Sequence, residues 1–159
     1  MDNILRILED NARLTNAEVA VLAGISEKEV EKRRAEYEKQ GVIVGYKALV
    51  DWDKTDRELV TALIEIKVAP QKDMGFDKVA DRISKHPEVR SVYLMSGGFD
   101  LTVIIEGKTM KEVALFVSGR LATMEGVTAT ATHFVLKKYK DEGVVFLDKN
   151  KDERGYTGV

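Results

Sequence analysis

Apolar residues near the start of the chain recur at helical spacing, with polar stretches between the groups. The spacing predicts three short helices. The first covers residues 2–11, and a second begins at Thr15, where Glu18 three positions later completes the pattern of a capping box. A third begins at Ser26, where Glu29 repeats that pattern. The residues expected to face the core of these helices are Ile4, Leu5, Leu8, Val19, Ala20, Leu22, Ala23, Val30, Ala35 and Tyr37.

Gly24 lies between the second and third predicted helices, where the chain must turn sharply. Glycine accepts the positive φ that such a helix end favours, so the arrangement is typical of a helix-turn-helix unit. Residues 42–50 are rich in β-branched side chains and predict a connecting strand. Residues 51–58 are polar, with Asp and Lys close together, and predict a linker. A first domain is therefore expected over residues 1–50.

From Leu59 onward the period of the pattern changes. Apolar and polar residues alternate along 60–68, which indicates a strand. Helical spacing follows after Pro70 and again after Thr109, which has Glu112 at capping-box distance. The further strands are predicted at 89–95, 99–105 and 127–136, with a tight hairpin turn at Gly97 and Gly98. The order β-α-β-β-α-β over residues 59–140 predicts a ferredoxin-like domain, so the fold class is α+β with an N-terminal helix-turn-helix.

The predicted sheet carries more apolar residues than one face can hold. Both helices of a ferredoxin-like unit cover the same face, and a second face that met water would be polar. No register turns all of the following residues inward: Leu63, Val92, Leu94, Ile104, Phe134 and Leu136. The surplus favours a homodimer in which a second copy covers the sheet. The alternative is that the tail, residues 141–159, folds over it, although its charges and glycines predict partial disorder.

Composition narrows the classes of protein that fit. The 159 residues include no cysteine, which excludes disulfides and thiolate metal sites and favours a reducing compartment. The start of the chain carries charge every few residues, unlike a signal peptide, and no apolar run approaches the roughly 20 residues that span a bilayer. We therefore expect a cytoplasmic protein with no membrane partner. The net charge of −2 means that DNA binding would depend on local geometry and on several subunits acting together.

Neither histidine fits the pattern of a metal site. His86 precedes Pro87 at a predicted helix end and His133 lies in a strand, and neither has a second histidine or a carboxylate at ligand spacing. The chain has no Gly-x-Ser-x-Gly, no phosphate-binding glycine loop and no recognisable pair of catalytic carboxylates. We expect no enzyme activity, no metal and no cofactor.

The order and spacing of several short motifs resemble the leucine-responsive/asparagine-synthesis regulator (Lrp/AsnC) family over nearly the whole chain. The motifs are Asn11-Ala12-Arg13, Glu18-Val19-Ala20 through Gly24-Ile25-Ser26, Gly41 to Tyr46, Ser96-Gly97-Gly98-Phe99-Asp100, and Gly126-Val127 before Thr128 to Thr132. The resemblance implies a winged or simple helix-turn-helix, a connecting strand and an effector domain whose dimers assemble further, commonly into octamers. It also implies a transcription regulator that binds double-stranded DNA and responds to an amino acid bound between dimers.

The third predicted helix supplies the candidate DNA contacts, which are Ser26, Lys28, Lys32, Arg33 and Arg34. The first two lie at the helix N-terminus, the end that usually meets base edges, and the others would reach phosphates. The alternative is a solvated helix face with favourable pairs such as Glu29 with Arg33. Acidic residues at positions 27, 29 and 31 occupy the start of the helix and would repel phosphates, although a glutamate accepts hydrogen bonds from cytosine.

The candidate effector site comprises Gly97, Gly98, Phe99, Asp100, Thr130 and Thr132. Small residues let backbone groups approach a ligand, and Asp100 adds a negative charge. By the resemblance, Thr130 and Thr132 lie near this turn, and their spacing of two places both hydroxyls on one face of the strand. These groups suit a zwitterionic amino acid, and Gly98, where many relatives have Asp, disfavours a ligand with a basic side chain. The alternative is a plain hairpin turn with positive φ at the glycines.

Two other functions fit the same architecture. A few proteins that resemble this family are tetrapyrrole decarboxylases of the siroheme type, for which His133 and Arg90 would be the only plausible catalytic carriers here. The other is a sensor subunit without DNA binding, which the acidic start of the third helix allows.

Overall fold

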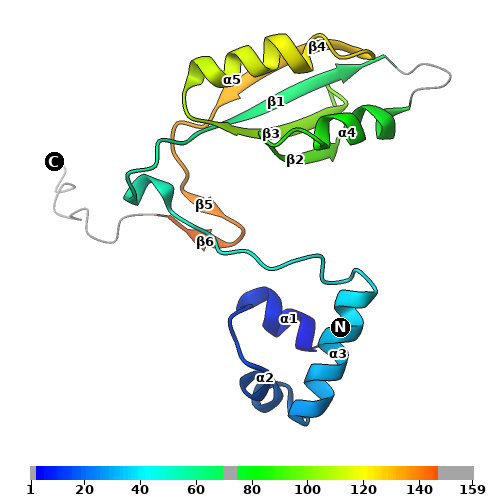
Figure 1. Cartoon of the computed structure of the whole chain (residues 1–159), viewed down its shortest axis with the longest axis vertical. Coiled ribbons are helices and arrows are strands. Elements are labelled where there is room, and N and C mark those ends of the chain that lie inside the picture. The colour runs from blue at the N-terminus through cyan, green and yellow to red at the C-terminus, as the bar shows by residue number, and fades with distance from the viewer. Residues whose placement is uncertain (1–2, 70–74, 147–159) are drawn as a thin grey trace, which may run out of the picture. The chain divides into compact units, whose positions relative to one another are not determined.

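The chain consists of two compact units, Met1–Val50 and Asp51–Val159, in a computed structural model that describes residues 3–69 and 75–146 (Figure 1). The first unit is helical and contains α1 (Asn3–Asp10), α2 (Asn16–Ala23) and α3 (Glu27–Lys39). Its core is formed by the buried side chains of Ile4, Leu8, Val19, Ala20 and Val30. The three predicted helices are confirmed.

Capping explains where α2 begins and ends. The Thr15 hydroxyl accepts from Glu18 N at 3.3 Å, and Thr15 N donates to the Glu18 carboxylate at 2.7 Å, so the predicted capping box is confirmed. Gly24 ends the helix with φ of 70°, a left-handed conformation that favours glycine. Two members of the expected core are wrong, because Leu22 is 58% exposed and Ala35 on α3 is exposed as well.

Two further predictions for this unit are wrong. The Ser26 hydroxyl caps α3 by accepting from Glu29 N at 3.2 Å, but the Glu29 carboxylate binds Arg33 at 2.7 Å and does not return to Ser26. A charged guanidinium outcompetes a backbone N–H as a donor, which prevents a second capping box. Residues 42–50 form no strand, because a strand requires a neighbour that accepts its backbone hydrogen bonds and no described segment of the chain supplies one.

The second unit is built on a four-stranded antiparallel sheet in the order β2-β3-β1-β4. Its elements are β1 (Val60–Val68), α4 (Phe76–Ser84), β2 (Val89–Leu94), β3 (Leu101–Gly107), α5 (Met110–Phe116) and β4 (Val127–Phe134). This is the split β-α-β arrangement that the sequence predicts. A short 3-10 helix, η1 (Trp52–Lys54), precedes it within the predicted linker.

The core lies between this sheet and its two helices. Alternate residues of β1 point inward, and Ala62, Ile64 and Ile66 have no exposed surface. They pack with buried residues of β3, α4 and α5, which include Leu101, Val103, Ile105, Val79, Ile83, Val113 and Phe116. Each strand therefore has one face toward the helices and one face, called here the outer sheet face, away from them. Its members include Leu63, Ile104, Tyr93, Ala129 and Ala131.

A π-helical turn, η2 (Val117–Leu121), follows α5 directly. Ala122 N donates to Val117 O at 2.8 Å, five residues back, so the helix gains one residue in this turn. The wider turn buries Phe116 and Val117 together with Leu121 on the sheet side. The helix predicted after Thr109 is therefore confirmed and extends to Leu121, although its last turn is not α-helical.

The connection between β2 and β3 is longer than the predicted tight turn. It spans residues 95–100, and neither Gly97 nor Gly98 has a positive φ. Met95 N donates to Asp100 O at 2.8 Å and closes the loop. At the C-terminal end, β5 (Lys140–Asp141) pairs with β6 (Val144–Val145). The remainder of the predicted tail, from residue 147, lies outside the described residues.

Candidate DNA-binding and effector sites

The face of α3 opposite the core carries a row of lysines. Val30, Arg34 and Tyr37 lie on the core side, as their spacing of four and three residues requires, and Val30 is fully buried. Residues two positions away face in the opposite direction. The exposed residues on that side are Lys28, Lys32, Ala35 and Lys39, at i, i+4, i+7 and i+11. We call these four residues the lysine stripe.

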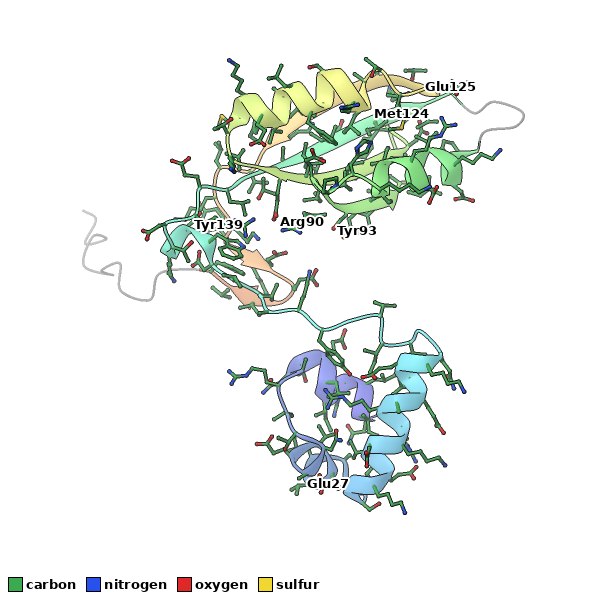
Figure 2. All side chains as sticks on the ribbon, in the orientation of Figure 1. Glu27, Arg90, Tyr93, Met124, Glu125 and Tyr139 are labelled. Atoms are coloured by element: carbon green, nitrogen blue, oxygen red, sulfur yellow. The ribbon has the colours of Figure 1, made fainter. Side chains whose placement is uncertain are left out.

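The acidic residues of α3 lie beside this stripe or are already paired. Figure 2 shows Glu27 at the beginning of the helix. The Arg33 guanidinium holds the pKa of Glu29 below its ordinary value, and the two side chains form an ion pair at 2.7 Å. Glu38 accepts a hydrogen bond from the Tyr46 hydroxyl at 2.9 Å. The acidic side chains of α3 therefore lie off the lysine stripe.

Arg34 connects three segments of the helical unit. Its Nε donates to the Tyr46 hydroxyl at 3.0 Å and its Nη1 donates to Asn16 Oδ1 at 3.1 Å. The guanidinium also lies 5.0 Å from the centre of the Tyr46 ring, within cation-π range. This residue therefore joins the start of α2 and the segment after α3.

The five candidate DNA contacts thus differ in their surroundings. Lys28 and Lys32 lie on the lysine stripe, and Ser26 is the helix cap. Arg33 and Arg34 have partners within the chain. Sequence reasoning missed Lys39, although the helical period from Lys28 and Lys32 would have found it, and it placed Ala35 on the buried side, where it is not.

Asp100 has a structural role in the effector domain. Its carboxylate accepts from Val68 N at 2.8 Å, and its own N donates to Ile66 O at 3.0 Å. These two bonds fasten the end of the β2–β3 loop to the end of β1. Gly97 and Gly98 are exposed, with open space where a side chain would begin, while Phe99 is half-buried.

Thr130 and Thr132 share the helix-facing side of β4, as their spacing predicts. They pair with Ile66 and Ile64 of β1, whereas Asp100 reaches Ile66 from the β3 side. β1 therefore separates Thr130 from Asp100, and two strand spacings amount to roughly 10 Å. The structure brings the loop and Thr130 to one level of the sheet without direct contact between them.

The residues of the decarboxylase alternative are far apart. His133 lies on edge strand β4 and is 3.4 Å from the Glu65 carboxylate, while Arg90 lies on the other edge strand, β2, and pairs with Glu106. Figure 2 shows Arg90 and Tyr93 reaching from β2 to the side of the sheet away from α5. Three strand spacings, roughly 14 Å, separate the two edge strands.

Within residues 3–69 and 75–146, no three acidic, histidine or cysteine side chains gather in a way that would hold a metal ion. Over the same residues, no helix has both the length and the apolar character that crossing a bilayer requires.

Both units match protein families. Residues 3–44 match a winged helix-turn-helix DNA-binding family, and residues 61–145 match the Lrp/AsnC ligand-binding domain. The HTH-type transcriptional regulator YugG of Bacillus subtilis is 49% identical over 152 residues, covering 95% of this chain and 92% of its own length. The leucine-responsive regulatory protein of Rhizobium meliloti is 31% identical over 138 residues, covering 87% of this chain and 88% of its own length.

Solved structures agree with these matches. A transcriptional regulator of Neisseria meningitidis in complex with L-methionine superposes with a TM-score of 0.71 at 28% identity, covering 87% of this chain and 89% of that protein. The structure of Escherichia coli AsnC shares the fold, with a TM-score of 0.66 at 21% identity over 86% of this chain and 90% of its own.

Proposed function

The chain belongs to the Lrp/AsnC family of transcription regulators, and from this premise we propose that α3 binds double-stranded DNA through its lysine stripe while the sheet domain binds an amino acid. The protein is a transcription regulator with a helix-turn-helix and a ligand-binding domain. What we infer beyond this is which residues carry each activity, and the chemical class of the effector.

The lysine stripe is the observation that carries the DNA assignment. Lysine ammonium groups neutralise phosphates and release counterions, which supplies much of the affinity of a protein for DNA. Lys28 is at the N-terminal end of the helix, which usually meets base edges, and Lys32 and Lys39 extend the charge along the groove. Ser26 at the helix cap and Arg33 on the helix are the further proposed DNA contacts. Arg34 is proposed to support this surface through its hydrogen bonds to Tyr46 and Asn16.

A gel-shift titration with DNA from the protein's own upstream region tests this assignment. Lys28→Ala together with Lys32→Ala is expected to weaken binding and to lower the slope of log affinity against log salt by about 0.9 for each phosphate that is no longer neutralised. Lys111→Ala, an exposed lysine on α5, is the matched control and should change neither quantity. An unchanged slope in the double variant would remove the stripe as the contact surface. No binding by the wild type at low salt would favour a sensor subunit without DNA affinity.

Assembly into oligomers fits the same proposal. The outer sheet face carries the half-buried Leu63 and Ile104 side by side, with Tyr93 and two alanines of β4 nearby. A second copy would cover this surface, and further association of dimers would give an octamer. Several helix-turn-helix units acting on one DNA molecule would offset the net charge of −2.

The proposed effector is an amino acid, bound near Gly97, Gly98, Phe99 and Asp100 with Thr130 and Thr132 from another part of the domain. The match to a ligand-binding domain and the similarity to a regulator solved with L-methionine support this class of ligand. Calorimetry over the twenty amino acids, followed by selection of genomic DNA fragments with and without the binder, tests it. Absence of binding by any amino acid would reject the effector class and leave the DNA assignment standing.

We also propose that the protein is not an enzyme and that it acts in the cytoplasm. The named relatives are transcription regulators, and the separation of His133 from Arg90 across the sheet disfavours a shared catalytic centre. Incubation with siroheme tests the first point, and its decarboxylation would contradict it.

A further inference from the structure

The chain turns back on itself where α3 ends. Gly41 has a φ of 70°, and its N donates to Glu38 O at 3.1 Å. Val42 N donates to Tyr37 O at 2.9 Å, so the two bonds form the Schellman motif that ends many helices. The next residue, Ile43, packs against the core of the helical unit. The first residues after α3 are therefore fixed to the helix.

Tyr46 brings the same segment back to α3. Its hydroxyl accepts from Arg34 Nε at 3.0 Å and donates to Glu38 Oε1 at 2.9 Å. Arg34 and Glu38 are four residues apart, so their side chains are neighbours on one face of the helix. The centre of the Tyr46 ring also lies 5.0 Å from the guanidinium carbon of Arg34. One side chain of the segment therefore bridges two charged side chains of α3.

The guanidinium that Tyr46 contacts also reaches α2. Arg34 Nη1 donates to Oδ1 of Asn16, the first residue of α2, at 3.1 Å, and both residues are half-buried. A guanidinium is planar and offers its donors in a fixed fork, so a partner at Nε limits where Nη1 can point. A path of contacts therefore runs from Tyr46 through Arg34 on α3 to the start of α2.

This path lies on the side of α3 away from the lysine stripe. Arg34 follows Lys32 by two residues, which turns its side chain about 160° away in a helix of 3.6 residues per turn. In a helix-turn-helix the recognition helix enters the major groove while the preceding helix crosses the backbone, so the angle between the two decides which side chains reach base edges. The path would therefore influence DNA binding through this angle.

We propose that Tyr46 is a positioning residue for DNA binding, which acts through Arg34 and does not touch the DNA itself. Its hydroxyl holds the guanidinium against Asn16 and so fixes the angle between α2 and α3. This role rests on the proposed binding of DNA by α3. Loss of the hydroxyl should reduce discrimination between DNA sequences, because base contacts depend on the helix angle, whereas the attraction of lysines to phosphates does not.

Gel-shift titrations of the full-length protein with two duplexes test this role. One is the genomic fragment that the wild type selects, and the other is a scrambled duplex of the same length and composition. Tyr46→Phe keeps the ring and removes only the hydroxyl. Its affinity for the selected fragment is expected to fall about three- to tenfold, the effect of one or two lost hydrogen bonds. Its affinity for the scrambled duplex, and the dependence of that affinity on salt, should not change.

Tyr139→Phe is the matched control and should bind both duplexes as the wild type does. Tyr139 is an exposed tyrosine of the second unit that also lies beside a cation, since Lys137 Nζ is 5.1 Å from the centre of its ring.

Arg34→Lys answers the same question if Tyr46→Phe does not fold. Lysine keeps the charge but lacks the rigid fork that joins Tyr46 to Asn16, so it should lose as much affinity for the selected fragment as Tyr46→Phe does. The double variant should lose no more than either single one, because the two residues act through one another. Circular dichroism shows whether each variant is folded at the assay temperature. A residue that only stabilised the helical unit would leave the affinity of a folded variant unchanged.

An unchanged ratio of the two affinities in folded Tyr46→Phe overturns the positioning role. So does an equal loss of affinity for both duplexes, which would indicate that the hydroxyl contacts the DNA backbone directly. A wild type that binds DNA without preferring the selected fragment also overturns this role and leaves the DNA assignment in place. A wild type that binds neither duplex overturns both.

Discussion

The Asp100 carboxylate forms a hydrogen bond that holds the fold together, whether or not a ligand is bound. It accepts from Val68 N at 2.8 Å where β1 ends, and it lies beside the loop that carries Gly97 and Gly98. A charged acceptor for a backbone N–H is stronger than a neutral one, and its removal leaves the N–H without a partner. Substitution of Asp100 would therefore affect the position of the loop as well as any contact with an effector.

Asp100→Ala is expected to lower the free energy of unfolding by about 1–3 kcal/mol, because it leaves Val68 N unsatisfied. Urea titration followed by circular dichroism measures the change. Asp77→Ala, which removes an exposed carboxylate of α4, should cost much less. If the two variants were equally stable, the hydrogen bond to Val68 would not contribute to the free energy of unfolding. Any weakening of effector binding in Asp100→Ala would then indicate that Asp100 contacts the effector directly.

Glu18 gives the stability of the helical unit a dependence on pH. Hydrogen bonds from Thr15 N and the Thr15 hydroxyl hold the pKa of Glu18 below its ordinary value of 4.5. A carboxyl whose pKa is lower in the folded state stabilises the fold above its unfolded pKa and loses this effect as pH falls through the folded pKa. Glu18→Gln should therefore be less stable than the wild type at about pH 6, and the difference should shrink at pH values below the lowered pKa. Urea titrations across this range test it, and a difference independent of pH would contradict it.

At the scale of elements, the close approach of Val113 on α5 to Gly107 at the end of β3 fixes the junction between the two elements. A Cβ at Gly107 would lie 2.9 Å from Val113 Cγ2, and Val113 is only 2% exposed, so neither atom has room to move. Lys108 N donates to the Glu112 carboxylate at 2.6 Å and holds the helix start against the strand end. The two elements therefore need glycine at this position for its size, since its φ is not positive.

Gly107→Ala is expected to destabilise the protein by about 1–3 kcal/mol, the usual cost of an extra methyl group in a filled space. Gly119→Ala is the matched control, because a Cβ there meets nothing within 4 Å in η2. Thermal or urea unfolding of both variants gives the comparison. Equal stability of Gly107→Ala and wild type would show that the helix start can shift at little cost.

Sequence patterns predicted the elements well because helix and strand periods are local properties. The capping of α2 by Thr15 depends on residues three apart and was predictable for the same reason. The partner of Glu29 was not, since Ser26 N and Arg33 are both within reach and only the folded geometry decides between them. The separation of Asp100 from Thr130 depends on strand order, which places β1 between two segments that the family resemblance had put together.

At the scale of the whole molecule, the net charge of the chain and its outer sheet face both favour the assembly of several copies on DNA. One chain has a net charge of −2 and a single lysine stripe, so its attraction to phosphate is modest. The outer sheet face places Leu63 between Ile104 on β3 and His133 on β4, near the middle of the sheet. Association through this face would join stripes from different copies, and binding at one site would raise the effective concentration at the next.

Leu63→Lys is therefore expected to weaken self-association by about tenfold or more, because it introduces a charge at the centre of the proposed interface without touching the helix-facing core. DNA affinity should fall with it while the circular dichroism spectrum stays unchanged. Leu115→Lys, on the exposed face of α5 with 60% of its surface accessible, is the matched control. Sedimentation velocity over a range of protein concentrations measures self-association and distinguishes the two variants. If Leu115→Lys dissociated the assembly and Leu63→Lys did not, copies would meet through the helical side, and the outer sheet face would need another partner.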